Sequence, residues 1–347
     1  MKAWQLMRIV PSPNLVLAEV AFPTVKQPDS VQVRVRASSI NALDYKFTQG
    51  YGHEGLQIAH DLRVLEGRNL FPLGLGRDFS GVVTAVGKNV KQFSIGDEVC
   101  GSVFINESAS FADYVLAGES NCALKPNNIN HLEAACISYA GQVAWNAVLP
   151  LVKTRRKSSR VFVQGGAGCV SSWIIQLLHT WGHHITTSCH SSSEKFVSSL
   201  GADSVLFYDS DSFSERMLSL ERFDCVIETL HKNPLSKSLM KERSNSIFVT
   251  TDAPPLRNLS RGLFGGIALT AYDFTRNTLC AAFNGNSYTW AFYTHNGKIL
   301  RKLTQLVEDK SVSPKIFKTF PFLQVPQALD CFAEGHCNGK VVIDHTI

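Results

Sequence analysis

The stretch Val161-Phe-Val-Gln-Gly-Gly-Ala-Gly-Cys-Val-Ser171, followed by Ser172-Trp-Ile-Ile-Gln-Leu-Leu178, decides the fold of this chain. An apolar run leads into clustered glycines and then into an apolar pattern with helical spacing, which predicts a strand, a tight turn and a helix. Such glycines let the backbone approach a pyrophosphate, and the helix N-terminus favours its charge. Gly166 and Gly168 are present, but Ser171 stands where a dinucleotide fingerprint carries its third glycine or alanine.

Length and composition favour an ordinary globular protein. The chain has 347 residues, which predicts two domains, and its hydrophobic content of 44% and charged content of 18% are typical of soluble proteins. The net charge is +5 with scattered Lys and Arg, and the densest basic run, 153–157, is interpreted as a solvated loop. No nucleic-acid-binding signature is present.

The cysteines and the hydropathy pattern bear on the cellular compartment. Nine cysteines without a CxxC pair predict free thiols in a reducing compartment. No run approaches the ~18–20 apolar residues of a membrane span. The given chain shows neither a signal-peptide core nor an Arg- and Ser-rich leader, so the residues alone favour the cytoplasm.

The pattern of predicted secondary structure changes near residue 130. Before it, short β-branched runs and Gly/Asp turns predict a small barrel-like domain, with strands at 31–37, 81–87 and within 93–101. After it, a helical pattern at 131–148 precedes apolar strands at 161–164, 185–187, 204–207, 225–227 and 246–249. Helical stretches at 171–181 and 193–200 separate these strands, which predicts a doubly wound parallel sheet. The tail is predicted as a helix from 298 and a final strand at 339–343.

An ordered set of motifs extends over essentially the whole chain. It comprises Ser39-Ile-Asn-Ala-Leu-Asp44, Gly76-Arg-Asp-Phe-Ser-Gly81, Gly96-Asp-Glu-Val99, Ala144-Trp145, the glycine turn, Leu200-Gly-Ala-Asp203 and Gly335-His-Cys-Asn-Gly-Lys340. This set resembles the quinone oxidoreductase branch of the medium-chain dehydrogenase/reductase superfamily. The resemblance implies a GroES-like β-barrel catalytic domain at 1–125, completed by 285–347, and a Rossmann dinucleotide-binding domain at 126–284.

The resemblance implies zinc-independent hydride transfer from NADPH to a quinone or another conjugated carbonyl. Zinc-dependent relatives carry a cysteine where this chain has Asn41 and a histidine where it has Arg77, so no metal is expected. Finer matches at 71–81, 290–292 and 319–328 resemble mitochondrial NADPH oxidoreductases linked to coenzyme Q. They imply a mitochondrial location and a peripheral membrane contact or a reticulon-type protein partner.

The same resemblance places Asn41, Asp44 and Tyr51 beside the nicotinamide as catalytic residues. The Asn41 amide is suited to donate a hydrogen bond to a substrate carbonyl, and Tyr51 to donate one or to stack on a quinone ring. The alternative is structural: Asn41 and Asp44 cap a turn, and Tyr51 packs.

Cofactor contacts are expected at the glycine turn and at three other places. At the end of the second Rossmann strand, 188–193 offers hydroxyls and an imidazole but no acid before Glu194, which favours NADPH over NADH. Lys195 lies nearby, and Tyr208 matches a family tyrosine at the same phosphate. Together with a position after the fourth strand and the loop 337–339, the expected set is Gly166, Ala167, Gly168, Cys169, Val170, His190, Ser191, Tyr208, Thr229, Cys337, Asn338 and Gly339.

Departures from the family pattern keep other functions open. Cys169 and Ser171 add bulk at the turn, and Thr229-Leu-His-Lys232, Ser138 and Val143 replace other family residues. One alternative is a non-catalytic scaffold that retains the fold but binds the cofactor weakly. Another is an enoyl-thioester reductase.

Overall fold

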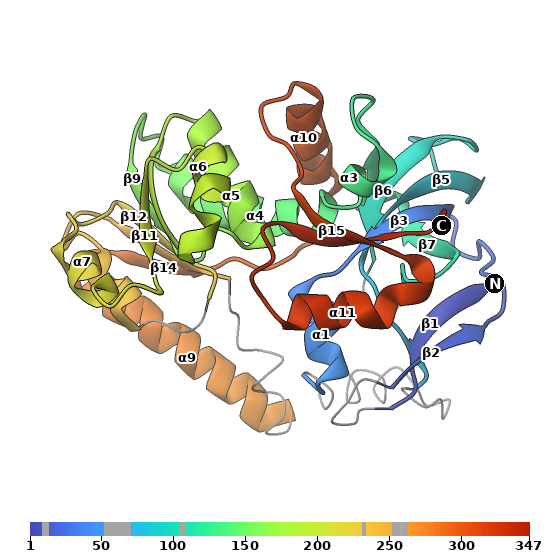
Figure 1. The fold of residues 1–347 in the computed structure, drawn as a ribbon, viewed down its shortest axis with the longest axis horizontal. Coiled ribbons are helices and arrows are strands. Elements are labelled where there is room, and N and C mark those ends of the chain that lie inside the picture. Colours follow the sequence, from blue (N-terminus) through green and yellow to red (C-terminus); the bar gives the residue numbers. More distant parts are fainter. Residues whose placement is uncertain (9–13, 52–70, 104–107, 231–233, 252–257, 259–262) are drawn as a thin grey trace. The chain divides into compact units, whose positions relative to one another are not determined.

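The computed structural model describes residues 1–8, 14–51, 71–103, 108–230, 234–251, 258 and 263–347, and it confirms the predicted α/β class (Figure 1). It divides into unit 1, Met1–Gln142 with His295–Ile347, and unit 2, Val143–Thr294. Both divisions fall later than the predicted boundaries at 125 and 284. Residues Ala135 and Cys136 pack in a core cluster with Ala37 and Val342 of unit 1, whereas the strand at 287–290 pairs within the sheet of unit 2.

Unit 1 is built on a mainly antiparallel sheet with the strand order β15-β16-β3-β5-β6-β8, in which β7 also pairs with β3. The strands are β3 (Ser30–Ser39), β5 (Asp78–Val86), β6 (Glu98–Ser102), β7 (Tyr114–Gly118), β8 (Cys122–Leu124), β15 (Ile316–Pro321) and β16 (Lys340–Asp344). Val31, Val33 and Val35 alternate along β3 and share a core with Phe79 and Val83, as the period of two predicts. The strands predicted at 31–37, 81–87, 93–101 and 339–343 are thus confirmed.

A second sheet and several helices complete unit 1. The second sheet has the order β2-β1-β4. These elements are β1 (Lys2–Leu6), β2 (Leu15–Glu19), β4 (Leu73–Gly74), α1 (Ala42–Thr48), η1 (Glu119–Asn121), α3 (His131–Ala134), α10 (Gly297–Glu308), η5 (Phe322–Gln324) and α11 (Val325–Ala333). Helix α11 lies along β15 and β16 (Figure 1). The helix α4 (Ser138–Lys153) begins in unit 1 and continues into unit 2, so the single helix predicted at 131–148 is two.

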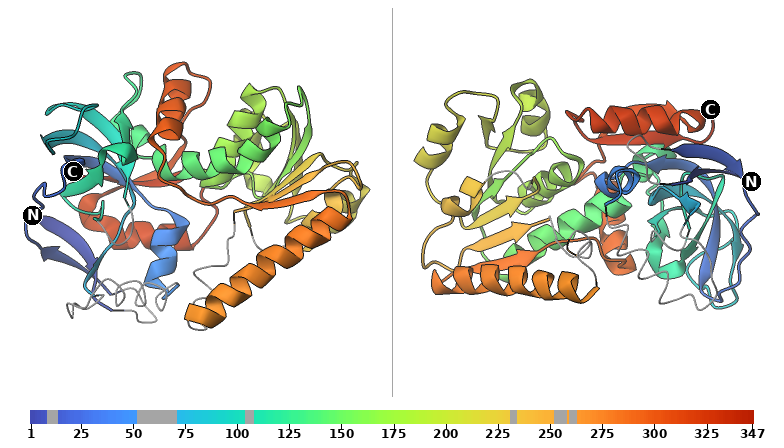
Figure 2. Two further views of the ribbon diagram at one scale, coloured as in Figure 1. Left: turned by 180° about the vertical axis from the view of Figure 1, so that it is seen from behind. Right: turned by 90° about the horizontal axis from the view of Figure 1, so that it is seen from below.

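Unit 2 contains a parallel six-stranded sheet in the order β11-β10-β9-β12-β13-β14. The elements are β9 (Arg160–Val163), α5 (Cys169–Thr180), β10 (His184–Cys189), η2 (Ser191–Ser193), α6 (Glu194–Ser199), β11 (Ser204–Phe207), α7 (Phe213–Ser219), β12 (Cys225–Glu228), η3 (Pro234–Leu239), β13 (Ile247–Thr250), α9 (Leu263–Phe283) and β14 (Ser287–Trp290). Figure 2 shows this sheet between its helices. The strand order reverses at β9, and the first glycine turn follows that strand, which is where open α/β sheets bind dinucleotides.

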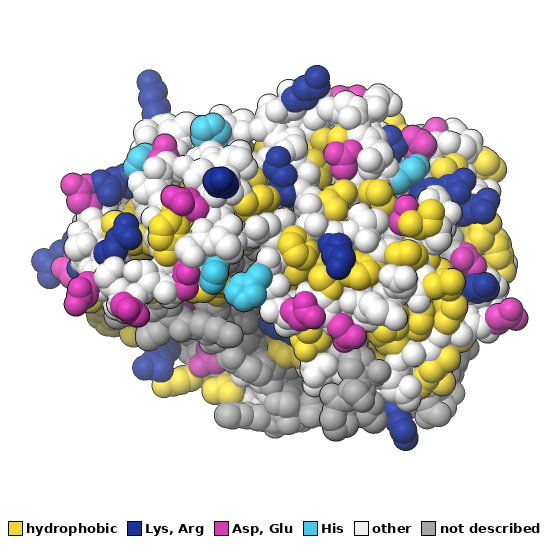
Figure 3. Space-filling view, viewed as in Figure 1, with side chains coloured by type: hydrophobic (Ala, Val, Ile, Leu, Met, Phe, Trp, Pro, Cys, Tyr) yellow, Lys and Arg dark blue, Asp and Glu magenta, His cyan; other side chains and the backbone are white. Residues whose placement is uncertain are grey.

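The surface and the cysteines agree with an ordinary globular composition. On the face drawn in Figure 3, cationic and anionic side chains are interspersed and form no basic patch. All nine cysteines are free thiols. Among the described helices, none is both long enough and apolar enough to cross a membrane.

Candidate functional site

The turn between β9 and α5 uses its first two glycines for packing. Gly165 has φ +70°, and a Cβ there would lie 2.6 Å from Cδ1 of Leu230. A Cβ on Gly166 would collide with Oγ1 of Thr187. The Gly165 N–H donates to the Ser188 hydroxyl and the Gly166 N–H to the Ser188 carbonyl, at 3.2 and 2.8 Å. The glycines therefore hold the turn tightly against the end of β10.

Gly168 differs, because its neighbours do not require a glycine. Its φ of −67° and ψ of 158° suit any L-residue, and an added Cβ would come no closer than 3.4 Å to the Gly165 carbonyl oxygen. Gly168 is also the N-cap of α5, so no side chain of its own caps the first N–H groups of that helix. Gly168 is also exposed, and an exposed backbone beside uncapped helical N–H groups is the arrangement that fits a pyrophosphate.

Ser171, which replaces the third glycine of the dinucleotide motif, is buried, and its hydroxyl points inward, toward the end of β12. Its Oγ lies 2.9 Å from Oγ1 of Thr229, which in turn donates to the Gln164 carbonyl at 2.6 Å. The extra side chain thus joins the turn to the end of β12. The Ser171 side chain, which the sequence suggested would crowd the phosphate, therefore lies inside the protein.

We expect Ser171→Gly to leave cofactor affinity unchanged rather than to tighten it. The substitution removes the Ser171–Thr229 hydrogen bond and places a glycine in the first turn of α5, which together cost about 1–2 kcal/mol of stability. Calorimetric titration measures the cofactor affinity of the variant, and thermal unfolding measures its stability. Ser171→Ala, which loses the hydrogen bond without adding a glycine, separates the two contributions to stability. Tighter cofactor binding by Ser171→Gly would show that the hydroxyl does obstruct the site.

The ends of β10 and β11 bring four polar side chains together. His190 and Ser191 follow β10, and Tyr208 and Asp209 follow β11. The rings of His190 and Tyr208 meet edge to face at 5.9 Å between centroids. Asp209 accepts hydrogen bonds from the Ser191 N–H and hydroxyl, at 2.9 and 2.6 Å. Three of the four were predicted from the sequence; Asp209 was not.

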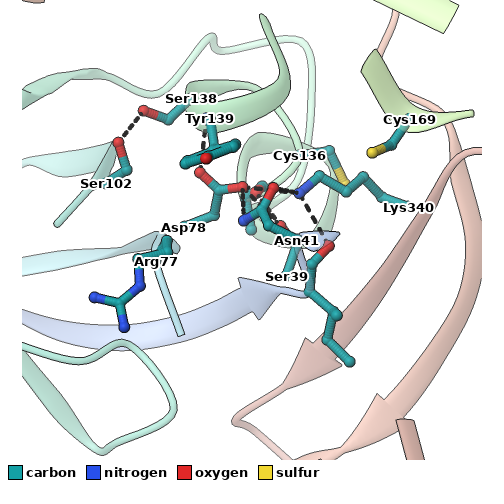
Figure 4. A network of polar contacts seen from close by, with 12 residues as sticks. Ser39, Asn41, Arg77, Asp78, Ser102, Cys136, Ser138, Tyr139, Cys169 and Lys340 are labelled. Carbon is teal, nitrogen blue, oxygen red and sulfur yellow. Dashed lines mark hydrogen bonds and ion pairs between the residues drawn. The ribbon is translucent and has the colours of Figure 1, made fainter. Parts of the chain in front are cut away.

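A buried polar network in unit 1 is centred on Asp78 (Figure 4). Oδ2 of Asp78 accepts from Nζ of Lys340 at 2.9 Å, Nδ2 of Asn41 at 3.0 Å and Oγ of Ser39 at 3.1 Å. Its Oδ1 accepts from the Tyr139 N–H at 2.7 Å. Lys340 also donates to Oδ1 of Asn41 at 2.6 Å. The Asn41 amide is therefore fixed from both ends, with one Nδ2 hydrogen beyond the bond to Asp78.

Arg77 and Asp44 form a second buried pair. Nε of Arg77 lies 3.4 Å from Oδ1 of Asp44, and both side chains are at most 2% exposed. Within the described part of the chain, no hydrogen bond engages any of the three Arg77 nitrogens, and in Figure 4 the guanidinium points away from Asp78. Burial raises the pKa of Asp44, which the Arg77 charge opposes, and burial lowers the pKa of Arg77. The pair retains N–H donors that no described residue engages.

The remaining predicted residues have structural contacts that explain part of their identity. Oδ2 of Asp44 accepts the Asn41 N–H at 2.9 Å and so caps the start of α1. The Tyr51 ring lies 5.2 Å from Nζ of Lys46. In the loop after α11, Gly339 has φ +109°, its N–H donates to the Cys337 carbonyl at 3.0 Å, and Asn338 lies between them.

The residues at the position of a catalytic zinc do not fit that ion. Oδ1 of Asn41 already accepts from the Lys340 ammonium, and Arg77 has no lone pair to offer. Among the described residues, no group of three or more His, Cys, Asp or Glu side chains could hold a metal.

Comparison with known proteins gives a consistent result. Residues 27–150 match the alcohol dehydrogenase GroES-like domain family, and residues 200–343 match the family described as zinc-binding dehydrogenase. The chain is 33% identical to NAD(P)H oxidoreductase RTN4IP1, mitochondrial, of Homo sapiens over 93% of this chain and 83% of that protein. It is 28% identical to reticulon-4-interacting protein 1, mitochondrial, of Caenorhabditis elegans, over 95% and 92%. The quinone oxidoreductase of Coxiella burnetii shares the fold, with a TM-score of 0.81, 24% identity and 99% of each chain covered.

Proposed function

The chain belongs to the medium-chain dehydrogenase/reductase superfamily, among its NAD(P)H oxidoreductases, and we propose that it reduces a quinone or another conjugated carbonyl without zinc. The observation that carries the cofactor half of this proposal is the exposed Gly168, where the backbone tolerates a Cβ, at the uncapped N-terminus of α5. A reduced nicotinamide supplies the hydride when bound, and the protein holds and orients it.

The proposed cofactor residues divide by the part of the dinucleotide they would hold. The turn residues Gly166, Ala167, Gly168, Cys169 and Val170 would receive the pyrophosphate, with Thr229 supporting them through Ser171. The group after β10 and β11, His190, Ser191 and Tyr208, would contact the adenosine ribose. The loop residues Cys337, Asn338 and Gly339 are also proposed as cofactor contacts. NADPH was expected from the hydroxyls and imidazole, but Asp209 now stands among them and is considered separately below.

The proposed substrate residues are Asn41, Asp44 and Tyr51, to which the structure adds Arg77. Hydride addition to a conjugated carbonyl leaves negative charge on its oxygen. Arg77 is a buried cation with N–H groups that the described residues do not engage, and it would stabilise that charge. Asn41 is positioned by Asp78 and Lys340 and would donate its remaining amide hydrogen. Asp44 would keep Arg77 in place.

A turnover assay with three acceptors tests the proposal. We expect the full chain to oxidise a reduced nicotinamide with a 1,4-quinone or an α,β-unsaturated ketone at least tenfold faster than with an enoyl-thioester, with no loss on chelator treatment. At a hundredfold excess over its dissociation constant the cofactor should add about 2.7 kcal/mol of stability. Faster turnover of the thioester would show that the protein is an enoyl-thioester reductase instead. No thermal shift with either NADPH or NADH would establish a scaffold instead.

The names of the relatives support a mitochondrial location and, more weakly, a reticulon-type protein partner. Several relatives are named mitochondrial, and one is named as interacting with reticulon-4. We therefore propose that the protein acts in mitochondria, and from the motif resemblance we propose that its acceptor is linked to coenzyme Q. Fractionation of cells expressing the full-length protein tests the location, and recovery outside mitochondria would refute it.

A further inference from the structure

We propose that Asp209 sets the cofactor preference of this chain and makes it favour NADH over NADPH. The inference rests on the proposed function, because it concerns the same dinucleotide site. It begins with strand register: Cys189 of β10 pairs with Phe207 of β11 in a parallel sheet. Ser191 and Asp209 each lie two residues beyond that pair, so they emerge side by side at the carboxyl edge where the adenosine ribose is expected.

Asp209 already occupies the donors that a ribose 2′-phosphate would need. Its Oδ1 takes the Ser191 backbone N–H at 2.9 Å and its Oδ2 takes the Ser191 hydroxyl at 2.6 Å. Oδ2 also lies 3.6 Å from Nε2 of His190. The positive charge of a protonated His190 would therefore be neutralised by Asp209 rather than be available to a phosphate. The hydrogen bonds from Ser191 lower the pKa of Asp209, which keeps it ionised at neutral pH.

The chemistry of the two cofactors then differs at this point. A 2′-phosphate carries about −1.5 to −2 charges at neutral pH and would lie against the Asp209 carboxylate, which repels it. The Ser191 N–H and hydroxyl, which could otherwise bind the phosphate, already donate to Asp209. A ribose 2′-hydroxyl is itself a donor and can bond to the same carboxylate. Lys195, exposed on α6 and close to Ser191 in sequence, is a cation that would favour a phosphate, so the experiment weighs it against Asp209.

Direct binding to the full-length chain measures this preference without relying on turnover. Calorimetric or fluorescence titrations would determine dissociation constants for NADH and NADPH, and for ADP and 2′,5′-ADP as fragment probes. We expect NADH to bind at least tenfold more tightly than NADPH, and ADP more tightly than 2′,5′-ADP. Asp209→Asn keeps the shape and one acceptor oxygen but removes the charge, and it should narrow the NADH/NADPH ratio at least fivefold, mainly by improving NADPH.

Asp211→Asn is the matched control. Asp211 is exposed and lies two residues further along the chain, and its substitution by Asn changes the net charge by the same amount. This control should leave the ratio unchanged, and melting temperatures would show that both variants are folded. Tighter NADPH binding by the wild type, or an unchanged ratio in Asp209→Asn, overturns the inference while the proposed function stands. Failure of both nucleotides to bind the wild type overturns the proposed function and this inference with it.

Discussion

Gly168→Val should abolish measurable dinucleotide binding while the protein stays folded. The backbone at Gly168 (φ −67°, ψ 158°) accepts a valine without strain. The nearest protein atoms to a new Cβ are the Gly165 carbonyl oxygen at 3.4 Å and Oγ of Ser171 at 3.8 Å, both at ordinary contact distance. The added methyl groups would fill the space that the proposed pyrophosphate needs. We expect the dissociation constants of NADH and NADPH to rise at least a hundredfold, or about 2.7 kcal/mol.

Gly118→Val provides a control of nearly identical geometry. Gly118 has φ −66° and ψ 147°, is also an N-cap residue, and a Cβ there would lie 3.5 Å from Nδ2 of Asn121. It belongs to unit 1, at the end of β7. Calorimetric titration of both variants would show binding lost in one and retained in the other, with similar melting temperatures. Retained affinity in Gly168→Val would mean that the pyrophosphate does not approach this turn.

The sequence was sufficient for features that depend on neighbouring residues. The strand predicted at 204–207 has those bounds, and the helix predicted at 171–181 occupies Cys169–Thr180, because hydrophobic period and glycine turns are local signals. The helix α9 (Leu263–Phe283) escaped prediction. It presents exposed apolar residues such as Phe264 and Phe283, 87% and 88% exposed, so no single apolar stripe marks one buried face.

The candidate sites depended on contacts that a sequence pattern does not reveal. Asp209 lies 18 residues from its partner Ser191. Asp78 and Lys340 are 262 residues apart and meet only because β16 returns to β3, the neighbour of β5. Motif matching could identify Ser171 as a departure, yet not that its hydroxyl would turn inward to Thr229. What a residue replaces was readable from the sequence, whereas the direction of its side chain required the fold.

Lys340→Met should strongly destabilise unit 1. The substitution keeps the apolar stem but removes the ammonium that lies 2.9 Å from the buried Asp78 carboxylate. Hydrogen bonds from Ser39, Asn41 and the Tyr139 N–H would remain, but the carboxylate would lose its ion-pair partner. Breaking one side of a buried pair costs about 3–5 kcal/mol, which corresponds to a melting shift of about 6–20 °C for a unit of this size.

A double-mutant cycle with Asp78→Asn separates the charge effect from simple loss of packing. Each single variant leaves one buried charge without its partner, whereas the Lys340→Met/Asp78→Asn double variant removes both charges. We therefore expect the double variant to be less destabilised than the sum of the singles by about 1–3 kcal/mol. Denaturant unfolding followed by circular dichroism measures all four proteins. Additive losses would mean that Lys340 acts through its bonds to Asn41 and the Ile40 carbonyl rather than through Asp78.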